Sequence, residues 1–292
     1  MTILFHQGAL GDWALTLPLL RALPPPLVLV APWSRSALAA RLLEMVEPFD
    51  IERPECSRLY TSQSPLDRDG PLAAHLRRAH LVISFVSSPG DPWGFNVQGL
   101  APKARLLFVH PRPPADWPGH VCDWHLHQLQ AQGLEVAQCP VAIRTNPRGP
   151  IVVHPGSGGQ AKCWGLERFE ALIELLRNAG RSVQVILGEV EHTTWDSGIL
   201  AHWQDDLGAR VVWMLDELCT ALEAAGRFVG NDSGPTHLSA QLGIPTLALF
   251  GPTNPAIWAP RGPRVQVLAP PEPGPIAWLS VQTVVESDLL GR

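Results

Sequence analysis

The chain has 292 residues and a formal net charge of -5, with 46% apolar and 17% charged residues. This length suggests two domains, and the composition excludes a disordered chain and a coiled coil. Nucleic-acid binding requires a basic face that meets phosphates, so nucleic acid is not an expected partner. Only two lysines occur, Lys103 and Lys162, and the other cationic side chains are arginines. Each lysine is therefore a candidate for a specific role.

The cysteines and the N-terminus predict a cytoplasmic protein. Five scattered cysteines without a CxxC pair are typical of reduced thiols rather than of a disulfide framework. The first residues do not have the pattern of a signal peptide. The longest apolar run, near Leu27–Ala31, is far shorter than the ~18–20 residues that a membrane span needs. Peripheral contact with a membrane surface stays open.

In the first half of the chain, short apolar runs alternate with helical patterns. Strands are predicted at residues 3–5, 27–31, 81–85 and 105–109, and helices at about 12–23, 36–45 and 121–132. The polar segment Thr145–Pro150 contains two prolines and a glycine, which predicts a linker.

The alternation restarts after this linker. Strands are predicted at 151–153, 183–187, 228–229 and 245–250, and helices at 166–179, 235–242 and 281–290. Such alternation is typical of parallel sheets covered by helices. We therefore predict an α/β protein with two Rossmann-like parallel-sheet domains, residues 1–147 and 148–292, facing an interdomain cleft. The last helix, 281–290, could pack back on the N-terminal domain.

Ligands of such sheets bind beyond the carboxyl ends of the strands, which directs attention to the loops there. In the loop after the first strand, Gly8 and Gly11 allow a tight turn and Asp12 starts the next helix. A carboxylate at this place could take a proton from a sugar hydroxyl, as a general base does. The alternative is that Asp12 only caps the helix.

The segment from His154 to Trp164 contains a Gly/Ser loop between a strand and a helix, which can present N–H groups to an anion. Lys162 adds a positive charge. Ala161 and Cys163 occupy the places where a Walker A loop needs Gly and Ser/Thr, so a diphosphate clamp without a bound Mg²⁺ fits better. The alternative is a surface lysine in a flexible loop.

A third segment, Asn231–His237, forms a turn between a strand and a helix. The N–H groups of Ser233 and Gly234 can face an anion, and Asp232 can accept hydrogen bonds from sugar hydroxyls. The alternatives are helix capping by Asp232 and Ser233, and a structural role for His237.

These segments together resemble glycosyltransferase family 9, the ADP-heptose:lipopolysaccharide heptosyltransferases. The resemblance rests on Gly11-Asp12 with the leucine-rich segment after it, on His154–Ser157 with Lys162 and Trp164, on Gly230–Leu238, and on Phe250–Thr253. It spans most of the chain, and its order and spacing are more specific than any single motif.

The resemblance implies a GT-B fold and an inverting, metal-independent transfer of a heptose or similar sugar from an ADP-sugar to a hydroxyl of a lipopolysaccharide-core-type acceptor. The N-terminal domain would bind the acceptor, which is lipid-linked or an oligosaccharide, and the C-terminal domain the nucleotide-sugar. Asp12 would be the general base. The donor-binding residues would be Ser157, Gly158, Lys162, Asp232, Ser233, Gly234 and His237. No cofactor is implied, since the ADP-sugar is a co-substrate, and a monomer is expected, with possible contact with the inner membrane.

Two departures from the family pattern concern the donor site. Family members often carry hydroxyl residues where Ser157 and Gly158 stand, and a threonine where Ser233 stands. Serine keeps the hydrogen-bonding hydroxyl, but Gly158 cannot supply one.

Other interpretations remain open. A zinc site could be drawn from the histidine-rich stretch His120, Cys122, Asp123, His125 and His127, although residues two apart on a helix do not share a face. A histidine-rich surface loop fits that stretch better. The competing functions are a sugar-nucleotide epimerase of the same fold and a non-catalytic nucleotide-sugar-binding protein. The acceptor, the donor sugar and the donor base are not fixed by the sequence.

Overall fold

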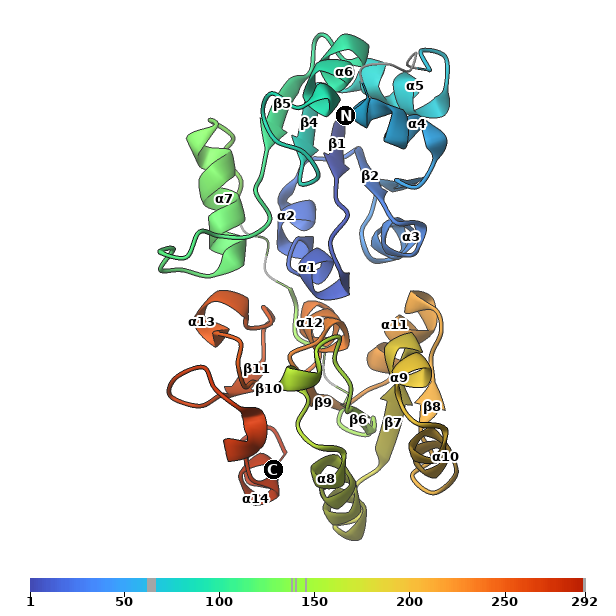
Figure 1. Ribbon diagram of the computed structural model, residues 1–292, viewed down its shortest axis with the longest axis vertical. Coiled ribbons are helices and arrows are strands. Elements are labelled where there is room, and N and C mark those ends of the chain that lie inside the picture. Colours follow the sequence, from blue (N-terminus) through green and yellow to red (C-terminus); the bar gives the residue numbers. More distant parts are fainter. Residues whose placement is uncertain (62–66, 138, 140, 145, 291–292) are drawn as a thin grey trace. The chain divides into compact units, whose positions relative to one another are not determined.

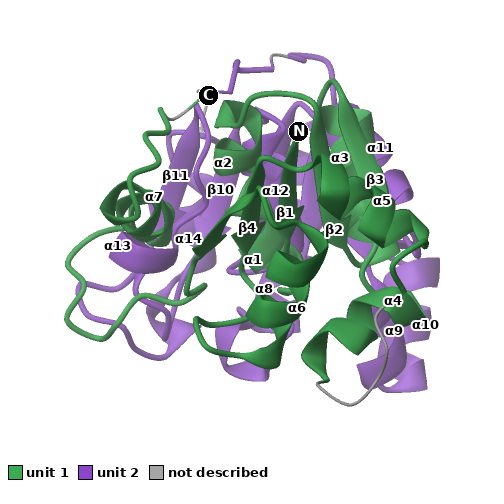
Figure 2. Cartoon of the chain, turned by 90° about the horizontal axis from the view of Figure 1, so that it is seen from above, with its two compact units in different colours: residues 1–139 green, residues 140–292 purple. Residues whose placement is uncertain are grey.

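The computed structural model describes residues 1–61, 67–137, 139, 141–144 and 146–290 (Figure 1). The chain forms two compact units, residues 1–139 and 140–292 (Figure 2). They are called the N-terminal and the C-terminal unit below.

The boundary between the units lies at 139/140, before the linker predicted at Thr145–Pro150. Thr145 itself lies outside the described residues. On either side of it, the Arg144 N–H donates to the Gly243 carbonyl (2.8 Å) and the Asn146 amide donates to the Ala224 carbonyl (2.8 Å). The described part of this segment therefore packs on the C-terminal unit.

The described residues of the N-terminal unit form a five-stranded parallel sheet in the order β3-β2-β1-β4-β5. Its strands are β1 (Thr2–Phe5), β2 (Leu27–Ala31), β3 (Val46–Asp50), β4 (Leu81–Ser84) and β5 (Arg105–Phe108). Its α-helices are α1 (Leu10–Ala14), α2 (Leu17–Ala22), α3 (Trp33–Leu42), α4 (Pro54–Ser57), α5 (Pro71–Arg78), α6 (Pro92–Leu100) and α7 (Val121–Ala131), with the 3₁₀ turn η1 (Arg58–Tyr60). The strand order reverses between β1 and β4, and in sheets of this type a ligand crevice forms at such a switch point.

The described residues of the C-terminal unit form a six-stranded parallel sheet in the order β11-β10-β9-β6-β7-β8. Its strands are β6 (Ile151–His154), β7 (Val183–Leu187), β8 (Arg210–Val211), β9 (Arg227–Asn231), β10 (Thr246–Leu249) and β11 (Val265–Leu268). Its α-helices are α8 (Leu166–Asn178), α9 (Glu189–Thr194), α10 (Ser197–Asp205), α11 (Leu215–Glu223), α12 (Gly234–Gln241), α13 (Pro255–Trp258) and α14 (Val281–Val285), with the 3₁₀ turns η2 (Gln160–Lys162) and η3 (Ile276–Trp278). The switch point lies between β6 and β9. This strand order is that of a Rossmann fold.

The prediction of a single helix over residues 12–23 is wrong. The segment forms α1 and α2, separated by a turn at Leu15 and Thr16. Pro18 has no N–H with which to continue a helix, so it stands in the first turn of α2 instead. The Thr16 hydroxyl donates to the Trp13 carbonyl (2.7 Å) and stabilises the turn.

Several elements were not predicted, among them β3, β8, β11 and the helices α4–α6, α9–α11 and α13. The sequence of β3, Val-Glu-Pro-Phe-Asp, shows why: it contains residues that are rare in strands, and only Phe49 is fully buried. Strand β3 exists because it pairs along its whole length with β2.

The sequence predicts a last helix over 281–290 and leaves open that it packs back on the N-terminal domain. It ends at Val285, and Val284, Leu289 and Leu290 are buried in the core of the C-terminal unit. The indole N–H of Trp164 and the Arg168 guanidinium both donate to the Leu279 carbonyl (2.9 and 3.0 Å). This C-terminal segment is therefore anchored on α8 of its own unit (Figure 1).

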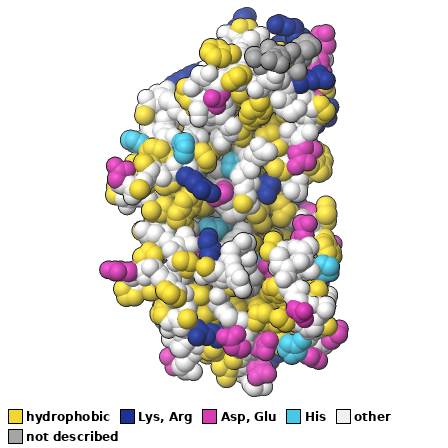
Figure 3. Space-filling model, in the orientation of Figure 1, with side chains coloured by type: hydrophobic (Ala, Val, Ile, Leu, Met, Phe, Trp, Pro, Cys, Tyr) yellow, Lys and Arg dark blue, Asp and Glu magenta, His cyan; other side chains and the backbone are white. Residues whose placement is uncertain are grey.

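Hydrophobic and uncharged side chains cover most of the face shown in Figure 3, with scattered charged groups between them. This agrees with a composition in which 17% of residues are charged. Among the described residues, no helix is both long and apolar enough to cross a membrane.

Two glycines with positive φ form a matched pair for a stability measurement. Gly243 (φ +80°) is packed so closely that a Cβ atom would lie 2.2 Å from the Ala142 carbonyl oxygen, whereas a Cβ at Gly180 (φ +74°) would meet no atom within 4 Å. We expect Gly180→Ala to lower the free energy of unfolding by about 1–2 kcal/mol, the cost of the left-handed backbone. Gly243→Ala should cost about 1–3 kcal/mol more, because of the added clash. Urea unfolding of both variants measures the difference, and equal losses would show that the contact with Ala142 is unimportant.

Candidate active site

The carboxyl ends of β6 and β9 bring together the two segments that the sequence selected in the C-terminal unit. The strands are paired in parallel, with His154 opposite Gly230. The loop after β6 carries Ser157 and Lys162, and the turn after β9 carries Asp232 and Ser233. Both segments therefore lie at the switch point of the sheet, where a ligand is expected.

Asp232 is the centre of a three-residue ionic cluster. Its Oδ2 atom lies 2.7 Å from Lys162 Nζ, and its Oδ1 atom lies 3.3 Å from His237 Nε2. Only 6% of the Asp232 side chain is exposed, against 38% of Lys162. Burial by itself raises the pKa of Asp232, but the hydrogen bonds and charges of His237 and Lys162 outweigh it and lower the pKa to about 2. Asp232 is therefore ionised at neutral pH.

Asn231 joins the loop after β6 to the turn after β9. Its side chain is fully buried; Oδ1 accepts the Trp164 N–H (3.0 Å), and Nδ2 donates to the Pro155 carbonyl (2.7 Å). The Ser157 hydroxyl adds a hydrogen bond to the Asp232 carbonyl (3.0 Å). The loop is thus held at both ends, and Lys162 is directed toward Asp232.

Helix capping does not explain the turn after β9. Ser233 is the N-cap residue of α12, but its side chain makes no capping hydrogen bond and its hydroxyl pairs with Thr236 Oγ1 (3.2 Å). Gly234 begins the helix. Gly158 is exposed, and a Cβ atom there would meet no atom within 4 Å, so a side chain at this position would fit.

A buried pair under the loop, His154 and Glu191, was not predicted. Glu191 Oε2 lies 3.4 Å from His154 Nε2 and accepts the Gly188 N–H (2.7 Å). Burial raises the pKa of Glu191, yet these hydrogen bonds and the His154 contact leave it lowered overall. A Cβ atom at Gly156 would lie 1.7 Å from Glu191 Oε1, so a side chain at position 156 would displace the Glu191 carboxylate from this place. A sequence signal that could have identified Glu191 is its place three positions after Gly188, which is typical of an acidic residue in the first turn of a helix. The helix itself, α9, was not predicted.

Asp12 lies apart from these residues along the chain, in the N-terminal unit. It is in the first turn of α1, whose N-cap residue is Ala9, so Asp12 does not itself cap the helix. It is half-buried and close enough to Arg35 and His125 to affect the pKa of each of them. The structure thus gives Asp12 a polar, partly enclosed setting beyond the carboxyl end of β1.

The histidine-rich stretch is neither a surface loop nor a cluster of ligands. It forms the beginning of α7: His120 Nδ1 accepts the Cys122 N–H (3.1 Å), the Cys122 thiol donates to the Leu15 carbonyl (3.2 Å), and His125 Nε2 lies 3.0 Å from the Pro111 carbonyl. His120 and His125 are buried. Within the described residues, no three His, Cys, Asp or Glu side chains are grouped to hold a metal ion.

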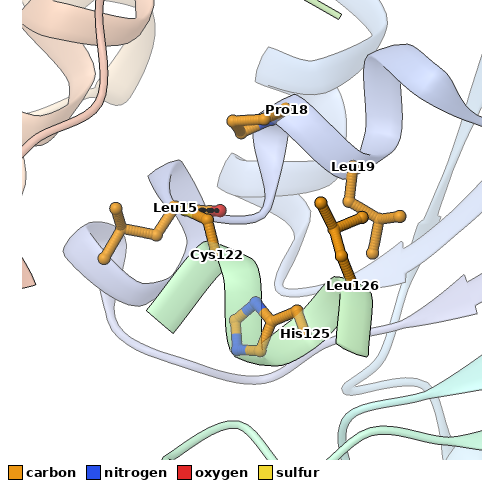
Figure 4. Close-up of a pocket in the computed structure, with 6 residues that line it drawn as sticks. All are labelled: Leu15, Pro18, Leu19, Cys122, His125 and Leu126. Carbon is orange, nitrogen blue, oxygen red and sulfur yellow. Dashed lines mark hydrogen bonds between the residues drawn. The ribbon is translucent and has the colours of Figure 1, made fainter. Parts of the chain in front are cut away.

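A small, largely apolar pocket lies between α7 and the turn that joins α1 to α2 (Figure 4). Its lining residues are Leu15, Pro18, Leu19, Cys122, His125 and Leu126. The His125 ring lies at one side of the pocket, and its Nδ1 atom is buried without a hydrogen-bond partner. Burial lowers the pKa of His125, so this nitrogen is an unused acceptor.

Two Rossmann-type parallel sheets, each with polar side chains beyond its switch point, define the class: the chain has the GT-B fold of glycosyltransferases. The model of glycosyltransferase family 9 (heptosyltransferase) matches residues 113–275, more than half of the chain. The chain belongs to this family. The matched residues include the whole Ser157–His237 cluster but not Asp12.

Known relatives agree with this assignment. The chain is similar to lipopolysaccharide heptosyltransferase 1 of Pseudomonas aeruginosa, with 29% identity over 220 residues, 71% of this chain and 54% of that protein. The chain spans about a third to just over half of the length of the curated relatives that it matches.

Solved structures share the fold over nearly the whole chain. E. coli ADP-heptose lps heptosyltransferase II has a TM-score of 0.68 and 20% identity, covering 98% of this chain and 97% of that chain. E. coli heptosyltransferase WaaC with ADP has a TM-score of 0.65 and 18% identity, covering 98% of each chain.

The lowered pKa of Asp232 makes a prediction for stability against pH. Because the folded-state pKa is below the unfolded value of 3.8, the ionised carboxylate stabilises the fold above about pH 4, and this stabilisation is lost as the pH falls toward 2. We expect Asp232→Asn to remove a pH-dependent contribution of about 1–2 kcal/mol. Urea unfolding of both proteins from pH 3 to pH 6 should show a difference that shrinks toward low pH. Asp116→Asn, at an exposed position, is the control, and a difference that does not vary with pH would contradict the pairing.

Proposed function

We propose that this chain is an inverting, metal-independent glycosyltransferase that moves a heptose or a similar sugar from an ADP-sugar to a hydroxyl of a lipopolysaccharide-core-type acceptor. The observation that carries the proposal is the cluster of Lys162, Asp232 and His237 at the switch point between β6 and β9, in a chain that belongs to glycosyltransferase family 9. The C-terminal unit binds the donor, and the N-terminal unit binds the acceptor.

Donor binding requires groups that hold a diphosphate and groups that hold a sugar. The Lys162 ammonium and the N–H groups of Gly158, Ser233 and Gly234 suit the diphosphate, because cations and helix N-termini attract phosphate oxygens. Ser157 contributes a hydroxyl. Asp232 and His237 can exchange hydrogen bonds with sugar hydroxyls. The E. coli heptosyltransferase WaaC, which has this fold, was solved with ADP, and this supports an adenine nucleotide as the donor base.

The Asp12 carboxylate accepts the proton of the acceptor hydroxyl while that oxygen forms a bond to the anomeric carbon of the donor sugar. The bond between this carbon and the diphosphate oxygen breaks, and ADP leaves with the electron pair. Attack from the face opposite to the leaving group inverts the anomeric centre. Lys162 and the loop N–H groups stabilise the charge that develops on the leaving diphosphate, so the step uses no cofactor.

The acceptor determines where the protein would work. A lipid-linked acceptor would bring a cytoplasmic, monomeric enzyme into peripheral contact with the inner membrane surface. An acceptor that is a free oligosaccharide would not require this contact. Vesicle co-sedimentation with and without the lipid-linked acceptor distinguishes the two.

The role of Asp12 is tested by Asp12→Asn, which keeps the shape of the side chain and removes its basicity. We expect the transfer rate to fall by about 10²- to 10⁴-fold, the usual contribution of a general base, while ADP-sugar binding is retained. Radiolabelled transfer from ADP-heptose to heptose-free lipopolysaccharide measures the rate, and calorimetry measures donor binding. Undiminished transfer by Asp12→Asn would refute the base assignment. An isomerised sugar nucleotide without any transfer would favour an epimerase, and binding without turnover a non-catalytic binding protein.

The two lysines provide a matched test of the diphosphate site. Lys162→Met should weaken ADP-sugar binding by roughly 10- to 100-fold, because a charge-assisted hydrogen bond is lost. Lys103→Met, at an exposed position of the other unit, should leave binding unchanged. Thermal shifts with ADP-, GDP- and UDP-sugars report binding, since a ligand raises the melting temperature by mass action. A shift with UDP-sugars but none with ADP-sugars would overturn the proposed donor.

A further inference from the structure

We propose that His6 is an acceptor-binding residue, which holds an acceptor oxygen next to the hydroxyl that Asp12 deprotonates. This inference rests on the proposed function and adds a second side chain to the acceptor site. His6 follows β1 directly, at the switch point of the N-terminal sheet. The ring is almost fully buried, with 2% of the residue exposed.

The hydrogen bonding of His6 fixes which nitrogen carries the proton. The Gly8 N–H donates to His6 Nδ1 (3.2 Å), so Nδ1 is an acceptor and the proton of the neutral ring is on Nε2. No partner for Nε2 occurs among the described residues. A nitrogen that is fully buried and has no partner is found in His125 (Nδ1). His6 Nε2 does not belong to this class, so it is not completely enclosed. A fixed N–H donor is thus available to a ligand at the edge of a buried ring.

This donor lies beside Asp12. A Cβ atom at Gly8 would lie 2.7 Å from His6 Cε1, 3.2 Å from His6 Nε2 and 2.9 Å from Asp12 Cβ. The edge of the imidazole and the Asp12 Cβ therefore both pack against Gly8, so closely that a side chain at position 8 would not fit between them. Nε2 and the Asp12 Cβ both lie within 3.2 Å of this one point, so the donor and the Asp12 side chain are neighbours, as a shared acceptor would require.

The surroundings keep His6 neutral, so that it cannot itself act as the base. Burial is the main cause that lowers its pKa to about 3, and the electrostatic effects of the nearby His125 on α7 and Arg35 on α3 lower it further. The Phe85 ring contacts both histidines, with its centroid 5.5 Å from that of His6 and 5.0 Å from that of His125. Asp12 is the nearby group that can hold the transferred proton.

A neutral donor next to a carboxylate suits a particular substrate geometry. The carboxylate accepts the proton of the nucleophilic hydroxyl, and the N–H group binds a lone pair of a neighbouring oxygen on the same sugar, such as an adjacent hydroxyl or the ring oxygen. Two such contacts orient the acceptor ring as well as place it. We therefore assign an acceptor in which the reacting hydroxyl has an oxygen neighbour within one sugar ring.

Two amide substitutions separate the functions of the ring nitrogens. The amide nitrogen of glutamine can occupy the place of Nε2, whereas the asparagine amide reaches only the place of Nδ1. We expect His6→Asn to raise the KM for heptose-free lipopolysaccharide by about 3- to 10-fold, the effect of one neutral hydrogen bond. The KM for ADP-heptose should stay unchanged, and His6→Gln should restore most of the acceptor affinity. The pH profile between pH 5 and pH 9 should keep its shape in both variants.

The outcomes separate this inference from the proposed function. Normal acceptor KM in a folded His6→Asn protein, or equal losses in the Asn and Gln variants, would overturn the role of His6 while transfer by the wild type upholds the function. Absence of transfer by the wild type would instead refute the function. NMR of the histidine nitrogens gives a readout without substrate: we expect His6 to be the neutral Nε2–H tautomer from pH 5 to pH 9. A protonated ring or the Nδ1–H tautomer would contradict the inference.

Discussion

The buried side-chain amide of Asn231 is the interaction on which the candidate donor site depends. It accepts a hydrogen bond from the Trp164 N–H and donates one to the Pro155 carbonyl, so it fastens the loop after β6 to the turn after β9. Both polar groups of a fully buried amide are satisfied in this way, and leaving either unpaired would cost the desolvation energy of that group. Because the loop cannot move away, the flexible Lys162 side chain reaches Asp232 at 2.7 Å.

The position of Lys162 matters because the chain as a whole carries negative charge. The proposed anionic donor would have to bind in the C-terminal half of a chain whose net charge is -5. Whether an anion can bind depends on the groups at the site itself, since exposed charges farther away than about 10 Å are screened by salt. The ammonium of Lys162 and the N–H groups at the start of α12 lie at the site itself. Asp232 pairs with Lys162 at 2.7 Å, and the proposed diphosphate would compete with this carboxylate for the ammonium.

The two units have the same kind of sheet, but the polar groups beyond its switch point differ in charge and in hydrogen-bonding ability. Each has a sheet whose strand order reverses once, and polar side chains directly follow β1 in the N-terminal unit and β9 in the C-terminal unit. In the C-terminal unit this place has a cation and hydrogen-bonding groups that fit a phosphate. In the N-terminal unit it has a carboxylate, a neutral imidazole and an arginine. The division matches what a transferase needs, because a donor must be held by its charge, whereas an acceptor hydroxyl must be oriented and deprotonated.

The sequence by itself determined the α/β class, the central strands, the family resemblance and the residues of the Lys162–Asp232–His237 cluster. These are strong local signals: apolar runs of strand length, glycine-rich turns, and charged residues at the ends of strands. It did not determine β3, the break between α1 and α2, or the anchoring of the last helix on α8. These depend on partners far away in the chain, since β3 exists by pairing with β2 and the C-terminal segment is held by Trp164 and Arg168.

Only the tertiary structure revealed the contacts of Asn231, of the His154–Glu191 pair and of His6. Each of these polar side chains is defined by its burial and by its hydrogen-bond partners. A sequence pattern shows neither the burial nor the partners. The candidate site residues were thus selected from the order of amino acids, but the buried contacts that fix their positions and protonation were decided by the fold.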